Sequence, residues 1–196
     1  MDLSSISALS PVDGRYGSKT AALRPYFSEF GLKYNRDLGE VRWWQCLAAH
    51  PQIAGVSPLS AKANALLENL IESFNETAAQ RVKDIESTTN HDVKAVEYYI
   101  KEQFKDNAEL LAVNEYVHFA CTSEDINNLA HGLMLKQGLE QVMLPAMQDV
   151  LSQIKQLAHD HQNQPMLSRT HGQTASPSTM GKEMANVAAR LQRQLK

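Results

Sequence analysis

The stretch Ser168-Arg-Thr-His-Gly-Gln-Thr-Ala-Ser-Pro-Ser-Thr-Met-Gly-Lys-Glu183 separates two segments whose apolar residues recur with helical spacing. It concentrates one histidine, several hydroxyls, an amide and two cations in a turn-rich sequence between helices, where side chains are free to face a ligand. His171 stands at its centre, and an imidazole exchanges its proton near neutral pH. The residue types fit two interpretations, a site for a polar anionic ligand and an ordinary polar loop.

Apolar residues at three- and four-residue intervals on both sides of this stretch are typical of amphipathic helices. The pattern predicts helices over residues 26–49, 61–85, 93–104, 126–143, 146–161 and 177–195. His50-Pro51 is expected to end the first helix, and Pro145 to kink or break the chain between two later ones. Ser60 and Ser176 are expected to cap helices, with Pro177 in the first helical position. No alternating run is long enough to predict a sheet, so we expect an all-α fold.

The composition is that of an ordinary globular protein. The chain has 196 residues, of which 43% are hydrophobic and 21% charged, with a formal net charge of −3. This charge provides no overall attraction to nucleic acid or to an acidic membrane surface. The start of the sequence has no signal-peptide pattern, and no stretch reaches the about 18 apolar residues of a membrane span. We therefore expect a cytoplasmic protein without nucleic-acid or membrane partners.

The cysteines and tryptophans have apolar or small neighbours. Cys46 and Cys121 lack metal-ligand spacing and are interpreted as reduced core thiols, and Trp43 and Trp44 as core residues. Only His159 and His161 are closely spaced, and two residues apart on a helix they point to different faces, so no metal site is predicted.

The segment Pro11-Val12-Asp13-Gly14-Arg15-Tyr16 combines a fixed proline φ with an Asp-Gly turn. We expect a defined loop that presents Arg15 and Tyr16. Arginine can bind a phosphate or carboxylate through two parallel hydrogen bonds, and tyrosine adds a stacking face. A plain surface turn is the alternative.

The helical pattern is interrupted at Glu86-Ser-Thr-Thr-Asn-His-Asp92. Thr89 or Asn90 is expected near a helix N-cap, with Asp92 in the first turn, where a carboxylate suits the positive helix end. Capping explains these residue types but not His91, because histidine is a poor capping residue.

A second interruption falls at Ala120-Cys-Thr-Ser-Glu-Asp-Ile-Asn-Asn128. Thr122 and Asp125, three residues apart, fit a capping box loosely. The alternative is that the free N–H groups and the hydroxyls of Thr122 and Ser123 bind a ligand carboxylate.

Four of these segments together resemble one family. They are Pro11–Tyr16, Thr88-Thr-Asn-His-Asp-Val-Lys-Ala-Val-Glu-Tyr98, Thr122-Ser-Glu-Asp-Ile-Asn-Asn128 and Arg169-Thr-His-Gly-Gln173. In this order they are similar to the bacterial adenylosuccinate lyase family of the fumarase/aspartase superfamily. The Asn-His-Asp form of the second segment differs from the corresponding loops of fumarases and aspartases.

The resemblance implies both a fold and an activity. The expected fold is a small N-terminal helical domain, residues 1–111, followed by the first part of a long-helix bundle, residues 112–196. The expected reaction cleaves adenylosuccinate to AMP and fumarate, and SAICAR to AICAR and fumarate, in purine biosynthesis. It uses a nucleotide substrate and no metal or organic cofactor. Four subunits are expected to form a homotetramer with shared sites.

The resemblance also implies residue roles. His171 is the expected general acid, and His91 is the second candidate for the acid or orients the substrate. The expected substrate-binding residues are Arg15 and Tyr16 for the nucleotide, Thr122 and Ser123 for the succinyl carboxylate, and Asn90, His91, Asp92, Thr170 and Gln173 around them.

One departure from the family concerns the catalytic base. The family's third region, a flexible Ser-Ser-rich loop that supplies the base, is not found in residues 1–196. The apolar stripe of the last helix still continues at Lys196, so we expect a piece of a longer molecule that does not turn over substrate alone. A sister enzyme such as argininosuccinate lyase, and a non-catalytic helical scaffold, remain as alternatives.

Overall fold

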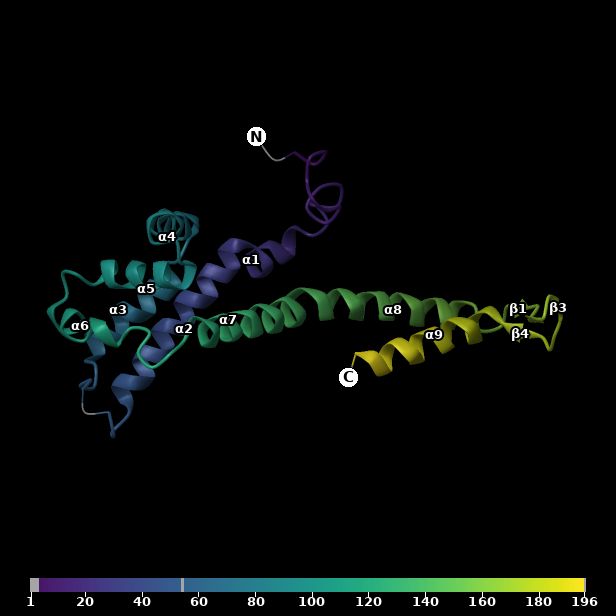
Figure 1. The fold of residues 1–196 in the computed structure, drawn as a ribbon. Coiled ribbons are helices and arrows are strands. Elements are labelled where there is room, and N and C mark those ends of the chain that lie inside the picture. The colour runs from purple at the N-terminus through teal and green to yellow at the C-terminus, as the bar shows by residue number, and fades with distance from the viewer. Residues whose placement is uncertain (1–3, 54, 196) are drawn as a thin grey trace. The chain divides into compact units, whose positions relative to one another are not determined.

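The computed structural model describes residues 4–53 and 55–195 and is helical along most of its length (Figure 1). The prediction of an all-α fold is confirmed, although four two-residue strands occur near the C-terminal end. Residues 1–3, at the start of the predicted turn-rich segment, and Lys196, at the end of the predicted last helix, lie outside the described residues. The chain divides into two compact units, residues 1–138 and 139–196. The domain boundary expected between residues 111 and 112 stays a prediction.

The first unit is built around one long helix, α2 (Glu29–Ala49). A 3₁₀ turn (Ala21–Leu23) and the short α1 (Arg24–Phe27) precede it. The helices that follow are α3 (Ala61–Glu72), α4 (Glu76–Thr89), α5 (Asp92–Gln103), α6 (Ala108–Ala112), a 3₁₀ turn (Asn114–Tyr116) and α7 (Ser123–Gly138). Helix α2 packs against α3, α4, α5 and α7, and α4 packs against α5. Such a central position buries α2 on several faces.

The core of this unit combines apolar side chains from α2 to α5. Trp44 is fully buried and packs near Phe104, with ring centroids 6.1 Å apart, which confirms its predicted place in the core. Trp43 is only partly buried, and its indole N–H donates to the Phe119 carbonyl at 2.7 Å. The interpretation of Cys46 as a core thiol is wrong, since its side chain is exposed, and Cys121 is only partly buried.

The predicted helix over residues 61–85 is two helices. Ser60 caps α3 as expected by accepting from the Ala63 N–H at 3.1 Å. The chain then leaves the helix at Ser73, and Asn75 caps α4 by accepting from the N–H groups of Thr77 and Ala78. The apolar spacing continues across this break, so periodicity alone did not reveal it.

The second unit is a helical hairpin with a small strand region at its turn. A π-helical turn (Leu139–Met143) leads into α8 (Leu144–Asp160). Strands β1 (Pro165–Met166), β2 (Arg169–Thr170), β3 (Gln173–Thr174) and β4 (Ser178–Thr179) follow, and α9 (Met180–Gln194) runs back along α8 (Figure 1). β1 pairs with β4 and β2 pairs with β3, both antiparallel.

One local prediction here is confirmed and one is wrong. Helices α7 and α8 are separate, as predicted, with the π-helical turn between them, and Pro145 lies in the first turn of α8, where a missing N–H does no harm. Ser176 and Pro177 do not start α9. Thr179 caps it instead, and its hydroxyl accepts from the Lys182 N–H at 3.1 Å. The pairing of β4 with β1 keeps residues 178–179 extended up to that cap.

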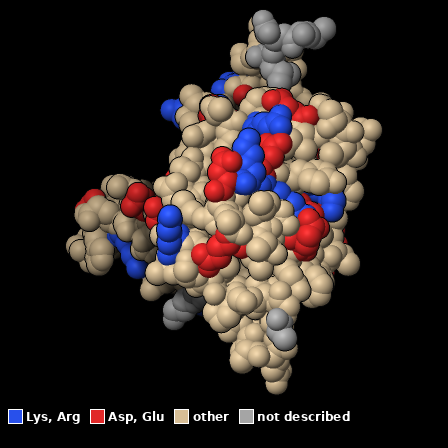
Figure 2. Space-filling view, turned by 90° about the vertical axis from the view of Figure 1, so that its left-hand side faces the viewer, with Lys and Arg blue, Asp and Glu red and all other residues tan. Residues whose placement is uncertain are grey.

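On the face drawn in Figure 2, Lys and Arg lie beside Asp and Glu rather than in a patch of one sign. The described residues include exposed ion pairs such as Arg81 with Glu102, 2.6 Å apart. Among the described residues, no helix is long and apolar enough to cross a membrane.

Candidate active site

A sharp corner between α4 and α5 carries three of the predicted site residues. Asn90 ends α4 in the left-handed conformation, with φ of 51°, and its N–H donates to the Glu86 carbonyl at 2.9 Å. Asparagine tolerates this conformation better than most residues. The predicted position of Thr89 and Asn90 near a helix N-cap is confirmed, since the N-cap of α5 is the next residue, His91, and Asp92 lies in the first turn. Thr89 donates its hydroxyl to the His91 carbonyl at 3.2 Å.

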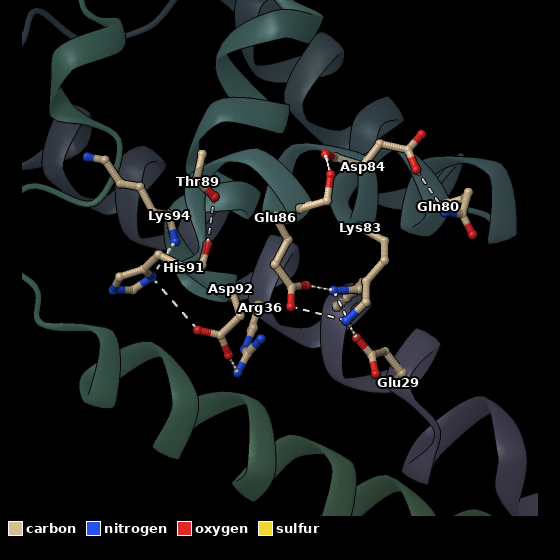
Figure 3. A network of polar contacts seen from close by, with 12 residues as sticks. Glu29, Arg36, Gln80, Lys83, Asp84, Glu86, Thr89, His91, Asp92 and Lys94 are labelled. Carbon is tan, nitrogen blue, oxygen red and sulfur yellow. Dashed lines mark hydrogen bonds and ion pairs between the residues drawn. The ribbon is translucent and has the colours of Figure 1, made fainter.

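His91 is the N-cap of α5, although it was expected to cap poorly. Its Nδ1 accepts from the Lys94 N–H at 3.2 Å (Figure 3). Because Nδ1 is the acceptor, the neutral ring carries its proton on Nε2. Nε2 lies 3.4 Å from the Ser123 hydroxyl, and half of the His91 side chain is exposed. The cap therefore fixes both the tautomer and the direction of a ring N–H.

The start of α7 forms the acid half of a capping box. The N–H and the hydroxyl of Thr122 both donate to Oδ2 of Asp125, at 2.7 and 3.0 Å. These two bonds lower the pKa of the Asp125 carboxyl. The capping box predicted for Thr122 and Asp125 is thereby confirmed in its acid half, while a role of Thr122 in carboxylate binding stays a prediction. The Ser123 hydroxyl is the group that faces His91.

A buried arginine from α2 connects these two helix starts. Arg36 donates from Nη2 to Oδ2 of Asp92 at 2.6 Å and from Nε to Oδ1 of Asn127 at 2.9 Å. Burial opposes ionisation of Asp92, but the Arg36 charge, with hydrogen bonds from Arg36 and the backbone, lowers its pKa overall. Sequence reasoning missed Arg36, because nothing in the spacing of a central helix shows which cation is turned inward.

Beside this corner lies an open pocket of about 510 Å³. Its lining residues are Lys83, Glu86, Ser87, Asn90, His91 and Asp92. Lys83 contacts Glu86 at 3.1 Å and Glu29 at 2.9 Å (Figure 3). The buried Lys33 reaches Glu86 at 3.0 Å. Burial opposes ionisation of Glu86, but its hydrogen bonds to the two lysines lower its pKa overall. Both lysines are therefore already paired with carboxylates.

Arg15 and Tyr16 lie in an ordered turn, as predicted. The Tyr16 N–H donates to the Pro11 carbonyl at 2.8 Å, and the Thr20 hydroxyl donates to the Val12 carbonyl at 3.0 Å. The Arg15 guanidinium lies 5.4 Å from the centre of the Tyr16 ring, a cation–π distance. Both side chains are exposed. The turn therefore presents a cation and an aromatic hydroxyl together.

His171 occupies the tip of a hairpin in the second unit. β2 and β3 pair Arg169 with Thr174 and Thr170 with Gln173, which leaves His171 and Gly172 as a two-residue loop. Both loop residues have positive φ, 53° and 76°, as a type I′ turn requires. Thr170, His171 and Gln173 are exposed and adjacent. This hairpin belongs to one unit, and the predicted residues 15–123 belong to the other.

Within residues 4–53 and 55–195, no three His, Cys, Asp or Glu side chains gather closely enough to bind a metal ion.

The family model described as "Lyase" matches residues 14–196 of the chain. The chain belongs to this lyase family. The match includes Arg15, the corner at His91, the start of α7 and the whole helical hairpin that carries His171.

Several lyases with curated names are similar over essentially the whole chain. Adenylosuccinate lyase from Vibrio cholerae is 59% identical over 196 residues, 100% of this chain and 43% of the relative. Those from Haemophilus influenzae and Escherichia coli (strain K12) are 56% and 57% identical and cover 100% and 99% of this chain. The chain spans only 43% and 42% of the length of these two relatives.

Solved structures of two other enzymes share the fold. β-Carboxy-cis,cis-muconate cycloisomerase from Acinetobacter calcoaceticus aligns with a TM-score of 0.67 at 22% identity, over 89% of this chain and 39% of that chain. A fumarate lyase from Mesorhizobium sp. BNC1 aligns with a TM-score of 0.63 at 21% identity, over 91% of this chain and 38% of its own. At such identities these likenesses concern the fold alone.

Proposed function

We propose that the natural polypeptide containing these 196 residues cleaves a C–N bond by β-elimination. The proposed reaction converts adenylosuccinate to AMP and fumarate, and SAICAR to AICAR and fumarate, in purine biosynthesis. The observation that carries this proposal is the 59% identity to an adenylosuccinate lyase over all 196 residues. The identity covers every segment from which site residues were predicted.

The reaction needs a base and an acid. A base removes a proton beside one carboxylate of the succinyl group, the resulting dianion is stabilised by hydrogen-bond donors, and the departing purine nitrogen takes up a proton. We assign the acid to His171. Its place at the tip of a defined hairpin supports this role, because the ring is exposed while its backbone is fixed by strand pairing. A positioned acid contributes about 10²–10⁴-fold to a rate.

The remaining predicted residues are proposed to bind substrate. Arg15 and Tyr16 suit a nucleotide, since the turn presents a cation and an aromatic face together. The hydroxyl of Ser123 and the Nε2–H of His91 suit a succinyl carboxylate, and His91 remains the second candidate for the acid.

Assembly and location are part of the same proposal. We assign the base to a region outside residues 1–196, and we place the enzyme in the cytoplasm as a homotetramer that uses no cofactor. Exposed apolar side chains along α8 and α9 support association through these helices; they are Met147, Val150, Leu157, Val187 and Leu191.

Fumarate release tests the proposal. The natural polypeptide is incubated separately with adenylosuccinate, SAICAR and argininosuccinate, and fumarate is followed by its absorbance. Release from the first two alone is expected. Release from argininosuccinate alone would identify the sister enzyme, and no release from any would favour a non-catalytic scaffold. Residues 1–196 by themselves are expected to release no fumarate, and turnover by this piece would overturn the assignment of the base.

A further inference from the structure

We propose that Arg36 is a positioning residue that sets the alignment of His91 with Ser123. This inference rests on the proposed function, in which these two side chains bind the succinyl carboxylate. Arg36 itself is 5% exposed and lies in the middle of α2, below the surface that carries the two groups.

The contacts of Arg36 reach both helix starts at once. Asp92, which accepts from Nη2, follows His91 directly in the chain. Asn127, which accepts from Nε, lies about one helical turn after Ser123 on α7. One planar guanidinium therefore links α5 and α7 to α2 at fixed distances of 2.6 and 2.9 Å (Figure 3 shows the Asp92 contact).

Each helix start is also ordered by its own cap. His91 accepts from the Lys94 N–H within α5, and Thr122 donates to Asp125 within α7. These local bonds fix the direction of the His91 ring and order the chain beside Ser123, but they do not set the separation of the two helices. The Arg36 bridge supplies that second constraint, which decides whether His91 and Ser123 converge on one carboxylate.

The chemistry of the bridge requires arginine. Its guanidinium carries donors in a rigid fork that addresses two acceptors in different directions. A lysine in this place has a single ammonium on a flexible chain and cannot reproduce both directions. The Arg36 charge also lowers the pKa of the Asp92 carboxyl against the opposing effect of burial. Replacement by lysine thus keeps the charge and removes the geometry.

The test compares two Arg→Lys variants of α2 in the natural polypeptide. Arg36→Lys is the probe, and Arg42→Lys is the matched control. Arg42 is exposed and donates hydrogen bonds to Glu68 from both terminal nitrogens, one of them at 2.7 Å. Steady-state kinetics with adenylosuccinate and the thermal midpoint are measured for each. We expect Arg36→Lys to lower kcat/KM by about 10- to 100-fold, mainly through KM, since a displacement of about 1 Å costs this much. Arg42→Lys is expected to stay within about twofold of the parent.

The outcomes separate the two proposals. An active parent with unchanged kcat/KM in Arg36→Lys overturns the positioning role alone. So does a loss in Arg36→Lys that disappears when rates are divided by the folded fraction measured at the assay temperature. An inactive parent overturns the proposed function and the positioning role with it. A double variant combines Asp92→Asn with Arg36→Lys. Its fold-loss in kcat/KM is expected to be smaller than the product of the two single fold-losses, because both changes break the same bridge.

Discussion

Nδ1 of His118 lies 2.6 Å from Oε1 of Glu40, a carboxylate on α2 that is completely buried. His118 has φ of 64° and stands in the short connection that leads to Thr122 and α7. Burial raises the pKa of Glu40, and the contact with His118 offsets this only in part. The other oxygen of Glu40 has no hydrogen-bond partner among residues 4–53 and 55–195. His118 is thus the partner that makes this buried carboxyl tolerable.

His118→Ala is expected to destabilise the protein by about 3–5 kcal/mol, since removing one member of a buried pair leaves the other uncompensated. The pKa of Glu40 then rises further, so the folded state binds the proton more tightly than the unfolded state. Stability is therefore lost as pH rises above the ordinary glutamate pKa. Thermal midpoints at pH 5 and pH 8 measure this, and the pH 8 value is expected to fall more. Adding Glu40→Gln removes the buried charge, so the drop in thermal midpoint caused by His118→Ala should become the same at pH 5 and pH 8. An equal drop at both pH values in His118→Ala alone would contradict the argument.

Asp37→Asn is expected to raise the thermal midpoint at pH 8 more than at pH 5. Asp37 is fully buried, and neither carboxyl oxygen has a hydrogen-bond partner within the described residues. Burial, with the nearby charge of Glu40, holds the pKa of Asp37 well above its usual value. A raised folded-state pKa means that stability is lost as pH rises from the unfolded value of about 3.9 toward the folded one. The exposed Asp106→Asn is the control and should shift neither midpoint.

The sequence predicted most helices because their apolar stripes are regular. Helix α2 was expected over residues 26–49 and spans Glu29–Ala49, and Pro51 lies just beyond its end. The break before Asn75 was missed because a capping asparagine does not disturb the apolar spacing. The buried carboxyls of α2 were also missed, since their burial depends on helices that pack around α2 from several sides.

The candidate site was predictable where the signal is local. The turn at Arg15 and the capping role of Thr122 follow from short-range residue patterns. The cap formed by His91 was not expected, because it depends on an imidazole nitrogen taking the place of the usual oxygen acceptor. Arg36 acts across 56 and 91 residues of sequence, and no local pattern encodes such contacts.

Two variants of His91 separate its capping role from its proposed role in binding. His91→Asn keeps a good N-cap and is expected to leave the thermal midpoint unchanged, while His91→Ala loses about 0.5–2 kcal/mol of stability. Both variants lack the Nε2–H beside Ser123, so both are expected to raise KM for adenylosuccinate by at least about tenfold. Thermal unfolding and steady-state kinetics of the natural polypeptide provide the two readouts. Normal kinetics in His91→Asn would restrict His91 to capping.

His171→Gln is expected to lower kcat by about 10²–10⁴-fold with little change in KM, because glutamine hydrogen bonds but does not deliver a proton. The fold should be unaffected, since His171 is exposed at the hairpin tip and strand pairing is made by its neighbours. His159→Gln, at an exposed position of α8 in the same unit, is the control and should keep the parent kcat. If kcat of His171→Gln stayed near the parent value, the acid would have to be sought at His91, where the variants of that residue already supply the comparison.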